Sequence, residues 1–304
     1  MNGTLRSIVK PLRNNDLVWR YGFNILPSLG YSFGGDAGLS VTERSVLKNL
    51  NRDGVAVTNV DEIFNDTSEF DRLGSQVGHL IESRKAEMDQ LRARANSVAS
   101  VGEKTFNTEL LESVLTVDPM DHFCRFALNS SFLNVANAYL RMYAKLRYYN
   151  VWYTFASSGE ARESQLWHFD REDNYILKVF VYLRDVYDGA GPFTYAPQTH
   201  RKGAFWNRLP EAHFENNVRR STDEQMHAVV PREKWIRATG KKGTIIFADT
   251  RGYHKGGEAR TDDRLMFTCM FTSPTSDSKE LLKYRETNSY ETFNRKQRRA
   301  IRSR

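Results

Sequence analysis

The feature that most constrains the fold is a change in sequence character near Leu146. Before this residue, apolar side chains recur at helical spacing, whereas after it short segments rich in aromatic and β-branched residues follow one another. Turn signals such as Asp188-Gly189 and Gly191-Pro192 separate several of these segments. The pattern predicts strands at residues 146–157, 165–170, 175–186, 192–197, 226–230, 243–249 and 264–272. It favours an α+β fold in which helices cover a β-sandwich or jelly roll.

The first part of the chain contains several helix signals. Ser40 and Glu43 match a capping box, and Gly54 is placed to end the helix that follows. Further helices are predicted from Phe70 towards Arg94 and over residues 129–143, with a short strand at 55–60. We therefore expect one structural domain in three parts. These are a mainly helical region (1–145), a β core (146–275) and a helical, basic C-terminal tail (276–304).

The positive charge is concentrated at the C-terminus. Of 44 Lys and Arg residues, six lie in Arg295–Arg304, which has no Asp or Glu, and the other 38 nearly balance the 37 acidic residues. The protein is thus a nearly neutral body with a basic tail, and we expect the core not to need that tail. The tail lacks interleaved aromatic residues, so it gives little reason to expect a nucleic-acid partner.

Cysteine content and hydropathy point to the cytoplasm. Cys124 and Cys269 are too few for a disulfide framework or a zinc ribbon. The most apolar run, Tyr175–Leu183, has about half the length of a membrane-spanning helix. We expect a cytoplasmic protein without a membrane partner.

Three residues have the pattern of a metal site. His168 and Asp170 lie two positions apart in a predicted strand, so both side chains point to the same face. His254 follows 84 residues after Asp170, just beyond the predicted strand 243–249. Two histidines and one carboxylate on one side of an ion leave positions open for other ligands, as in non-haem Fe(II) oxygenases. Alternatively, His168 is an ordinary strand histidine beside a solvated Asp170, and His254 a loop histidine with one hydrogen bond.

Arg264 opens an otherwise apolar strand ten residues after His254. A guanidinium in this position is either a charge at the sheet edge or an anchor that binds a carboxylate with two parallel hydrogen bonds.

The stretch Leu146–Ser273 resembles the phytanoyl-CoA dioxygenase family of Fe(II)/2-oxoglutarate-dependent oxygenases. The resemblance rests on Gln165–Asp170, Leu177–Val186, Gly191–His200 and Asp249–Gly257 followed by Arg264, in the order and spacing of the family. It implies a double-stranded β-helix (a cupin-like jelly roll) that binds Fe(II) through His168, Asp170 and His254. Arg264 would hold the distal carboxylate of 2-oxoglutarate. The implied reaction uses dioxygen and releases succinate and CO2, and the presence of Asp170 favours hydroxylation over halogenation.

The chain departs from the family in two places. The turn that usually reads Pro-Gly-Ser-His is Pro197-Gln198-Thr199-His200 here. Some relatives have a serine two residues past the distal histidine, where this chain has Gly256, so the resemblance implies no second contact to the distal carboxylate from this position. Arg260 is a competing anchor, although its loop position makes it the weaker choice.

Three further residues are candidates for cosubstrate binding. Lys178 interrupts an apolar strand, and it either reaches solvent at an edge or points with Tyr182 into the barrel, towards 2-oxoglutarate or an anionic substrate. Thr250 either assists the cosubstrate or stabilises a turn.

The sequence thus predicts an Fe(II)/2-oxoglutarate-dependent dioxygenase that hydroxylates an unidentified small molecule. One alternative is a cupin-like metal-binding protein without oxygenase activity, which would keep the histidines but would not need Arg264. The other is a protein that binds a partner through its basic tail.

Overall fold

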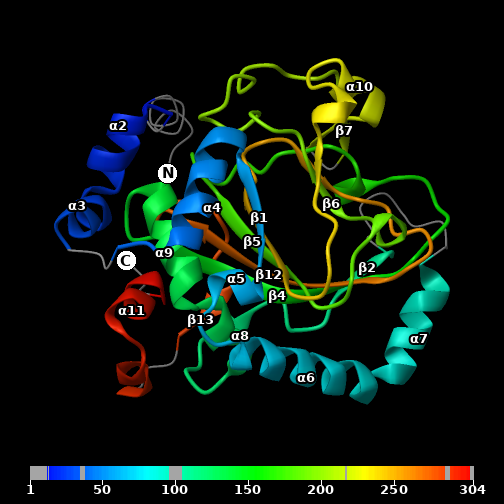
Figure 1. Cartoon of the computed structure of the whole chain (residues 1–304), viewed down its shortest axis with the longest axis horizontal. Coiled ribbons are helices and arrows are strands. Elements are labelled where there is room, and N and C mark those ends of the chain that lie inside the picture. Colours follow the sequence, from blue (N-terminus) through cyan, green and yellow to red (C-terminus); the bar gives the residue numbers. More distant parts are fainter. Residues whose placement is uncertain are drawn as a thin grey trace, which may run out of the picture.

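Two antiparallel sheets form the centre of the computed structural model, which describes residue 12 and residues 14–34, 38–95, 105–215, 218–284 and 288–301 (Figure 1). The larger sheet has the order β1 (Val55–Asn59), β10 (Thr244–Asp249), β5 (Leu177–Tyr182), β12 (Arg264–Thr272), β4 (Lys145–Thr154) and β2 (Asn107–Glu109). The smaller sheet has the order β11 (His254–Gly256), β6 (Phe193–Tyr195) and β9 (Ile236–Arg237). This two-sheet arrangement confirms the predicted jelly roll.

Alternation along the strands of the larger sheet gives it two different faces. Val179, Phe247 and Phe267 point away from the barrel into a core shared with the helices. Their neighbours Phe180 and Ile246 point between the two sheets, where they meet Phe193 and Tyr195 of β6. The position of each side chain along β5, β10 and β12 therefore decides whether it stabilises the helical layer or lines the barrel.

The helices pack mainly on the outer face of the larger sheet. The N-terminal ones are α2 (Asp16–Val18), the π-helical turn η1 (Trp19–Phe23), α3 (Ile25–Phe33), α4 (Val41–Asp53), α5 (Val60–Ile63), α6 (Ser68–Ser83) and α7 (Lys85–Arg94). Those that follow are α8 (His122–Ala127), α9 (Ser130–Leu140), α10 (Asp223–His227) and α11 (Arg295–Ile301). The short 3₁₀ turns are η2 (Glu163–Gln165), η3 (Asp188–Ala190), η4 (Arg232–Lys234) and η5 (Asn288–Thr292). Figure 1 shows α2, α3 and α11 at one edge of the molecule and α7 at the opposite edge.

Several local predictions are confirmed. Ser40 and Glu43 form both hydrogen bonds of the capping box on α4, and Gly54 ends that helix in the left-handed conformation, with φ of 83°. The predicted helix over 70–94 is divided into α6 and α7 at Arg84. Cys124 and Cys269 are buried and unpaired thiols.

Two local predictions are wrong. Residues 226–230 are not a strand, because Thr222 and Gln225 form a capping box that begins α10 instead. Residues 165–170 are not a continuous strand either, and only isolated bridges occur there, Trp167 with Ser221 and His168 with His254. Residues 1–145 also do more than cover the core, since β1 pairs with β10 and β2 pairs with β4 in the larger sheet.

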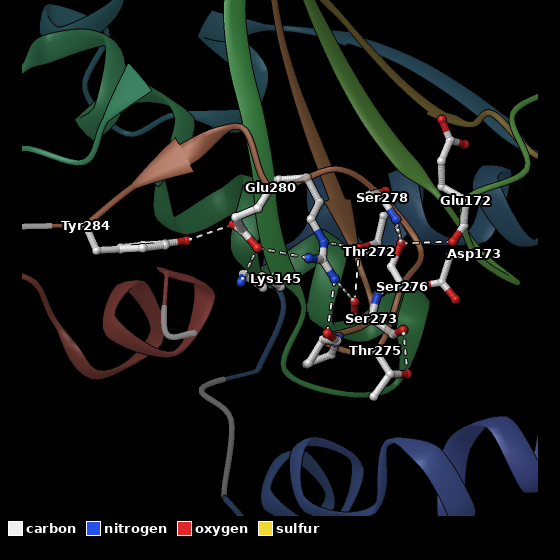
Figure 2. Close-up of polar contacts among 12 residues, drawn as sticks. Lys145, Glu172, Asp173, Thr272, Ser273, Thr275, Ser276, Ser278, Glu280 and Tyr284 are labelled. Carbon is white, nitrogen blue, oxygen red and sulfur yellow. Dashed lines mark hydrogen bonds and ion pairs between the residues drawn. The ribbon is translucent and has the colours of Figure 1, made fainter. Parts of the chain in front are cut away.

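The chain after β12 is fastened to the body. Arg147 of β4 donates hydrogen bonds from Nε to the Thr272 hydroxyl (2.7 Å) and from Nη2 to the Ser273 carbonyl oxygen (2.6 Å), and Glu280 pairs with Lys145 (2.8 Å; Figure 2).

The remaining strands form two short pairs. β13 (Leu282–Lys283) lies parallel to β3 (Leu115–Thr116), and β7 (His213–Glu215) is antiparallel to β8 (Val218–Arg220).

The basic C-terminal segment is not simply a detached tail. Residues 295–301 form α11, in which Ala300 and Ile301 are buried in the main core. Burial of these side chains couples the segment to the body, while the expectation that the core does not need it stays a prediction. None of the helices in the described ranges is long and apolar enough to cross a membrane.

Candidate metal centre

Backbone hydrogen bonds bring the two distant segments of the site together. His168 N–H donates to the His254 carbonyl oxygen (3.0 Å), and His254 N–H donates back to His168 (2.9 Å). Two residues further on, Asp170 N–H donates to the carbonyl oxygen of Thr250 (2.8 Å). The segment after Trp167 is thus fixed against the turn between β10 and β11, which explains how residues separated by 84 positions share one site.

His168, Asp170 and His254 each present a possible ligand atom, and these atoms all lie within 4.8 Å of one another. The two imidazole centroids are 4.4 Å apart. All three residues line a cavity of about 550 Å³ between the sheets. Two nitrogen donors and one carboxylate on one wall of a cavity fit a facial three-ligand metal site with open positions.

The ring orientations of the two histidines suit metal binding. Nδ1 of His168 lies 2.9 Å from the Leu166 carbonyl oxygen, and Nδ1 of His254 lies 3.0 Å from that of Gly252. A carbonyl oxygen can only accept, so each Nδ1 carries the proton and each Nε2 keeps its lone pair. Burial lowers the pKa of His254. Burial and the neighbouring His254 ring lower the pKa of His168 well below its usual range. Both rings are therefore neutral, as metal ligation requires.

Lys178 pairs with Asp170. Its Nζ lies 2.7 Å from Asp170 Oδ2, and about 15% of each side chain is exposed (16% and 14%). Burial opposes ionisation of Asp170, but the Lys178 ammonium outweighs it, so the pKa of Asp170 falls below its usual range. The structure thus places Lys178 beside the candidate ligand set, at the cavity wall.

Arg264 is a buried cation with no acidic partner among the residues that the structure describes. Its side chain lines the same cavity, and Nη1 donates only to the carbonyl oxygens of Ala190 (3.3 Å) and Gly257 (3.2 Å). Within the part of the chain that the structure describes, Arg264 pairs with no carboxylate, and its Nε has no hydrogen-bond partner. Burial lowers its pKa. A buried guanidinium in this state is a site for an anion from outside the chain.

Gly256, at the position where some relatives have a serine, lies beside Arg264. A Cβ added to Gly256 would lie 3.3 Å from Arg264 Nη2, so the glycine leaves space around the guanidinium. Thr154 of β4 offers a hydroxyl 3.4 Å from the same nitrogen and also lines the cavity. The competing anchor, Arg260, turns away and contacts Glu258 and the carbonyl oxygens of Ser157 and Gly159.

Two of the sequence candidates do not reach the cavity in the described structure. Tyr182 is fully buried, and its hydroxyl donates to the Ala238 carbonyl oxygen (2.7 Å) and accepts from Phe193 N–H (3.1 Å). Burial raises the pKa of Tyr182 to about 12. Thr250 is also buried, and its backbone bonds to Asp170 and Ile176. The buried Thr250 hydroxyl has no hydrogen-bond partner among the described residues, and the cosubstrate roles of both residues stay predictions.

Some residues at the site were not identified from the sequence. Arg251 donates from Nη1 to the carbonyl oxygen of Asp170 (2.8 Å), and its place in the segment 249–257 was a usable signal. Arg220 lines the cavity and pairs with the buried Glu163 (2.9 Å), which adopts a positive φ of 49°. No local sequence pattern indicates that pair, because it joins segments 57 residues apart.

The turn Pro197–His200, where the chain departs from the family pattern, contains a residue in the left-handed backbone conformation. Gln198 has a φ of 63°, the left-handed region where glycine is favoured. The next residue, Thr199, accepts from Tyr253 N–H through its hydroxyl (2.8 Å) and donates to Ala196 (2.7 Å). The turn therefore supports the segment that leads into His254.

Comparisons with known proteins bear on the family and on the fold. The family model described as Phytanoyl-CoA dioxygenase (PhyH) matches residues 50–266. A search of curated proteins found no significant match. Among solved structures, EctD from S. alaskensis with 2-oxoglutarate and 5-hydroxyectoine is 16% identical, with a TM-score of 0.50, and the match covers 85% of this chain and 92% of that one. The epimerase SnoN, in complex with Fe3+, alpha ketoglutarate and nogalamycin RO, is 16% identical, with a TM-score of 0.49 and coverage of 77% and 85%.

Proposed function

The chain belongs to the phytanoyl-CoA dioxygenase family of non-haem iron, 2-oxoglutarate-dependent oxygenases, and on that premise we propose that it hydroxylates a small-molecule substrate in the cavity lined by His168, Asp170, His254 and Arg264. The observation that carries this proposal is the combination, in one cavity, of a three-ligand face and a buried guanidinium that has no acidic partner within the described ranges. The first feature suits a divalent metal ion and the second suits a dicarboxylate cosubstrate.

His168 and His254 would hold Fe(II) through Nε2, and Asp170 would supply the anionic ligand. The carbonyl oxygens of Leu166 and Gly252 keep both imidazoles in the required tautomer and orientation. Lys178 restrains Oδ2 of Asp170, which leaves Oδ1 as the less encumbered donor. Its ammonium also offsets the carboxylate charge while no cation is bound.

Arg264 would bind the distal carboxylate of 2-oxoglutarate, with Thr154 as its hydroxyl companion in place of the serine found in some relatives. Two observations support this assignment: no carboxylate of the described residues balances the Arg264 charge, and Gly256 leaves space beside the guanidinium. Because Arg264 is held by two backbone carbonyl oxygens, its guanidinium is oriented before any cosubstrate enters.

When bound, iron and 2-oxoglutarate supply the oxidising power to hydroxylate an unactivated carbon with dioxygen, releasing succinate and CO2. The chain's own contribution is to position the reactants and to exclude water. Aromatic side chains of Trp152, Phe169 and Phe193 line the cavity and provide apolar walls for a substrate. We propose a small organic molecule because the cavity volume of about 550 Å³ suits one.

The test is anaerobic addition of 2-oxoglutarate to the Fe(II)-loaded protein. We expect an absorbance band that needs both components, one metal per chain, and succinate formation once oxygen is admitted. His168→Ala and His254→Ala should each abolish the band, because two protein ligands seldom hold a labile Fe(II). A protein that binds one iron with intact residues yet gives neither the band nor succinate would instead be a cupin-like metal protein without oxygenase activity.

A further inference from the structure

The edge strand β2 brings a residue of the N-terminal region to the wall of the cavity. β2 is the outermost strand of the larger sheet, next to β4 (Figure 1). Its Asn107 lies opposite Thr154 of β4 in the antiparallel register, and both residues line the cavity that contains Arg264. Backbone hydrogen bonds on both sides of β2, each 2.8 Å long, hold the strand in place. No sequence signal pointed to Asn107, because the motifs that carry the family resemblance begin later in the chain.

Two consecutive hydrogen bonds join Asn107 to Arg264 through Thr154. Arg264 Nη2 donates to the Thr154 hydroxyl oxygen (3.4 Å), and the same hydroxyl donates to Asn107 Oδ1 (3.0 Å). A threonine hydroxyl has only one proton, so this arrangement leaves Thr154 without a proton to give to a bound carboxylate. Thr154 therefore holds the guanidinium as an acceptor, and Asn107 sets the direction of its hydroxyl.

The amide nitrogen of Asn107 is the polar atom that this arrangement leaves for a ligand. Oδ1 accepts from Thr154, whereas Nδ2 has two protons and bonds to none of the residues that the structure describes. The side chain is half-buried and lines the cavity. It thus adds a neutral donor to the same wall as the Arg264 guanidinium. An anion that binds such a guanidinium can accept from both groups.

Position 256 cannot supply this second donor. A Cβ added to Gly256 would lie 3.3 Å from Arg264 Nη2, so a serine there would place its hydroxyl near the guanidinium, but glycine has no side chain to donate. Ser164 is the competing donor, because it lines the cavity and its carbonyl oxygen lies 3.7 Å from the same Cβ position. Unlike Asn107, Ser164 forms no hydrogen bond with Thr154 or Arg264 in the described structure.

We propose that Asn107 completes the anchor for the distal carboxylate of 2-oxoglutarate. Its Oδ1 fixes the Thr154 hydroxyl, which orients the Arg264 guanidinium, and its Nδ2 donates to the carboxylate that this guanidinium binds. The inference rests on the proposed function, since it takes 2-oxoglutarate as the cosubstrate. It gives the region 1–145 a direct part in cosubstrate binding.

The test is calorimetric titration of 2-oxoglutarate into the full-length protein loaded with Mn(II). Asn107→Ala should lower the affinity roughly tenfold, because it removes a hydrogen bond to a charged group and frees the Thr154 hydroxyl. The affinity for Mn(II) should stay unchanged. At saturating 2-oxoglutarate the anaerobic absorbance band of the Fe(II) protein should recover its full height. Succinate formation should show a raised KM for 2-oxoglutarate with kcat retained.

Asn107→Asp separates this role from simple support of the strand. The carboxylate keeps an acceptor for the Thr154 hydroxyl, but it loses the amide donor and places a negative charge near Arg264. It should therefore lower 2-oxoglutarate affinity further than Asn107→Ala does. It should also raise the melting temperature of the protein without cosubstrate, because the buried guanidinium gains an acidic partner. If Asn107 only supported the strand, this gain in stability would be absent.

The matched control is Thr108→Ala in the same strand. By the alternation of a strand, Thr108 points away from the cavity, and its hydroxyl donates to the Glu109 carbonyl oxygen (3.5 Å). This variant should bind 2-oxoglutarate like the parent protein. The proposal is overturned if Asn107→Ala binds 2-oxoglutarate as tightly as the parent, if Thr108→Ala loses as much affinity, or if Ser164→Ala shows the loss instead. In each of these cases the parent still binds 2-oxoglutarate, so the proposed oxygenase activity stands. A parent protein that binds no 2-oxoglutarate would refute that activity itself.

Discussion

Replacing Lys178 with methionine tests whether its ammonium balances the charge of Asp170 before metal binds. The change keeps an unbranched chain of similar length but leaves the Asp170 carboxylate without its partner at 2.7 Å. Removing one member of a buried ion pair costs about 3–5 kcal/mol. Because both side chains retain some exposure and line an open cavity, we expect the lower end, about 3 kcal/mol.

For a chain of this length, that loss lowers the melting temperature of the metal-free protein by roughly 5 °C. Thermal unfolding followed by circular dichroism, after treatment with a chelator, measures it. Adding Asp170→Asn to Lys178→Met should restore much of the lost stability, because no buried charge is then left unpaired. Mn(II), which does not undergo redox cycling here, should raise the melting temperature more in Lys178→Met than in the parent protein, since the cation replaces the missing ammonium.

Two results would refute this reasoning. If metal-free Lys178→Met melts at the parent temperature, the ion pair contributes no stability and Lys178 is an ordinary lysine that reaches solvent. If Mn(II) stabilises both proteins by the same number of degrees, Lys178 does not interact energetically with the metal position, and its place at the cavity wall has another purpose.

Three further predictions concern the anchor, the acidic ligand and the C-terminal helix. Arg264→Lys keeps the charge but loses the two parallel hydrogen bonds of the guanidinium. Calorimetry should therefore show 2-oxoglutarate affinity reduced roughly ten- to a hundredfold, with Mn(II) affinity unchanged. If Arg260→Lys alone caused this loss, the anchor would be misassigned. Asp170→Ala removes the anionic ligand and spares both imidazoles, so some metal binding should remain while succinate formation is lost in a coupled assay. Truncation after Asn294 should lower the free energy of unfolding in urea by about 2–3 kcal/mol, because it removes the buried Ala300 and Ile301. An unchanged urea midpoint would show that α11 does not stabilise the protein.

The residues of the candidate site were accessible from the sequence because their signals are local. His168 and Asp170 are two positions apart, and the segment Asp249–Gly257 contains its histidine at a recognisable place. Capping chemistry is equally local, as Ser40 and Glu43 show. The prediction failed at residues 226–230, where an apolar run suggested a strand but the capping box of Thr222 began a helix. The local hydrogen bonds of the cap outweighed the strand-like composition.

The sequence did not show which residues pair with the charged side chains of the site. Alternation along β5 places Lys178 on the barrel face, but nothing local shows which charge lies opposite, and solvent, cosubstrate and substrate all stayed open. The structure places Asp170 there because the segment after Trp167 is fixed against the turn after β10. Arg220 and Glu163 illustrate the same limit.

By itself, then, the sequence indicated the class of fold, the three candidate metal ligands and the candidate anchor, since each was read from side-chain types and from motifs that resemble a known family. Tertiary structure alone decided that Arg264 has no acidic partner among the described residues, that Ala300 and Ile301 of α11 are buried, and that Leu26 and Phe33 of α3 are exposed. The physical reason is that periodicity defines a face of a helix or strand but not its surroundings. Those surroundings are fixed by contacts between residues far apart along the chain, whose free energy no local pattern encodes.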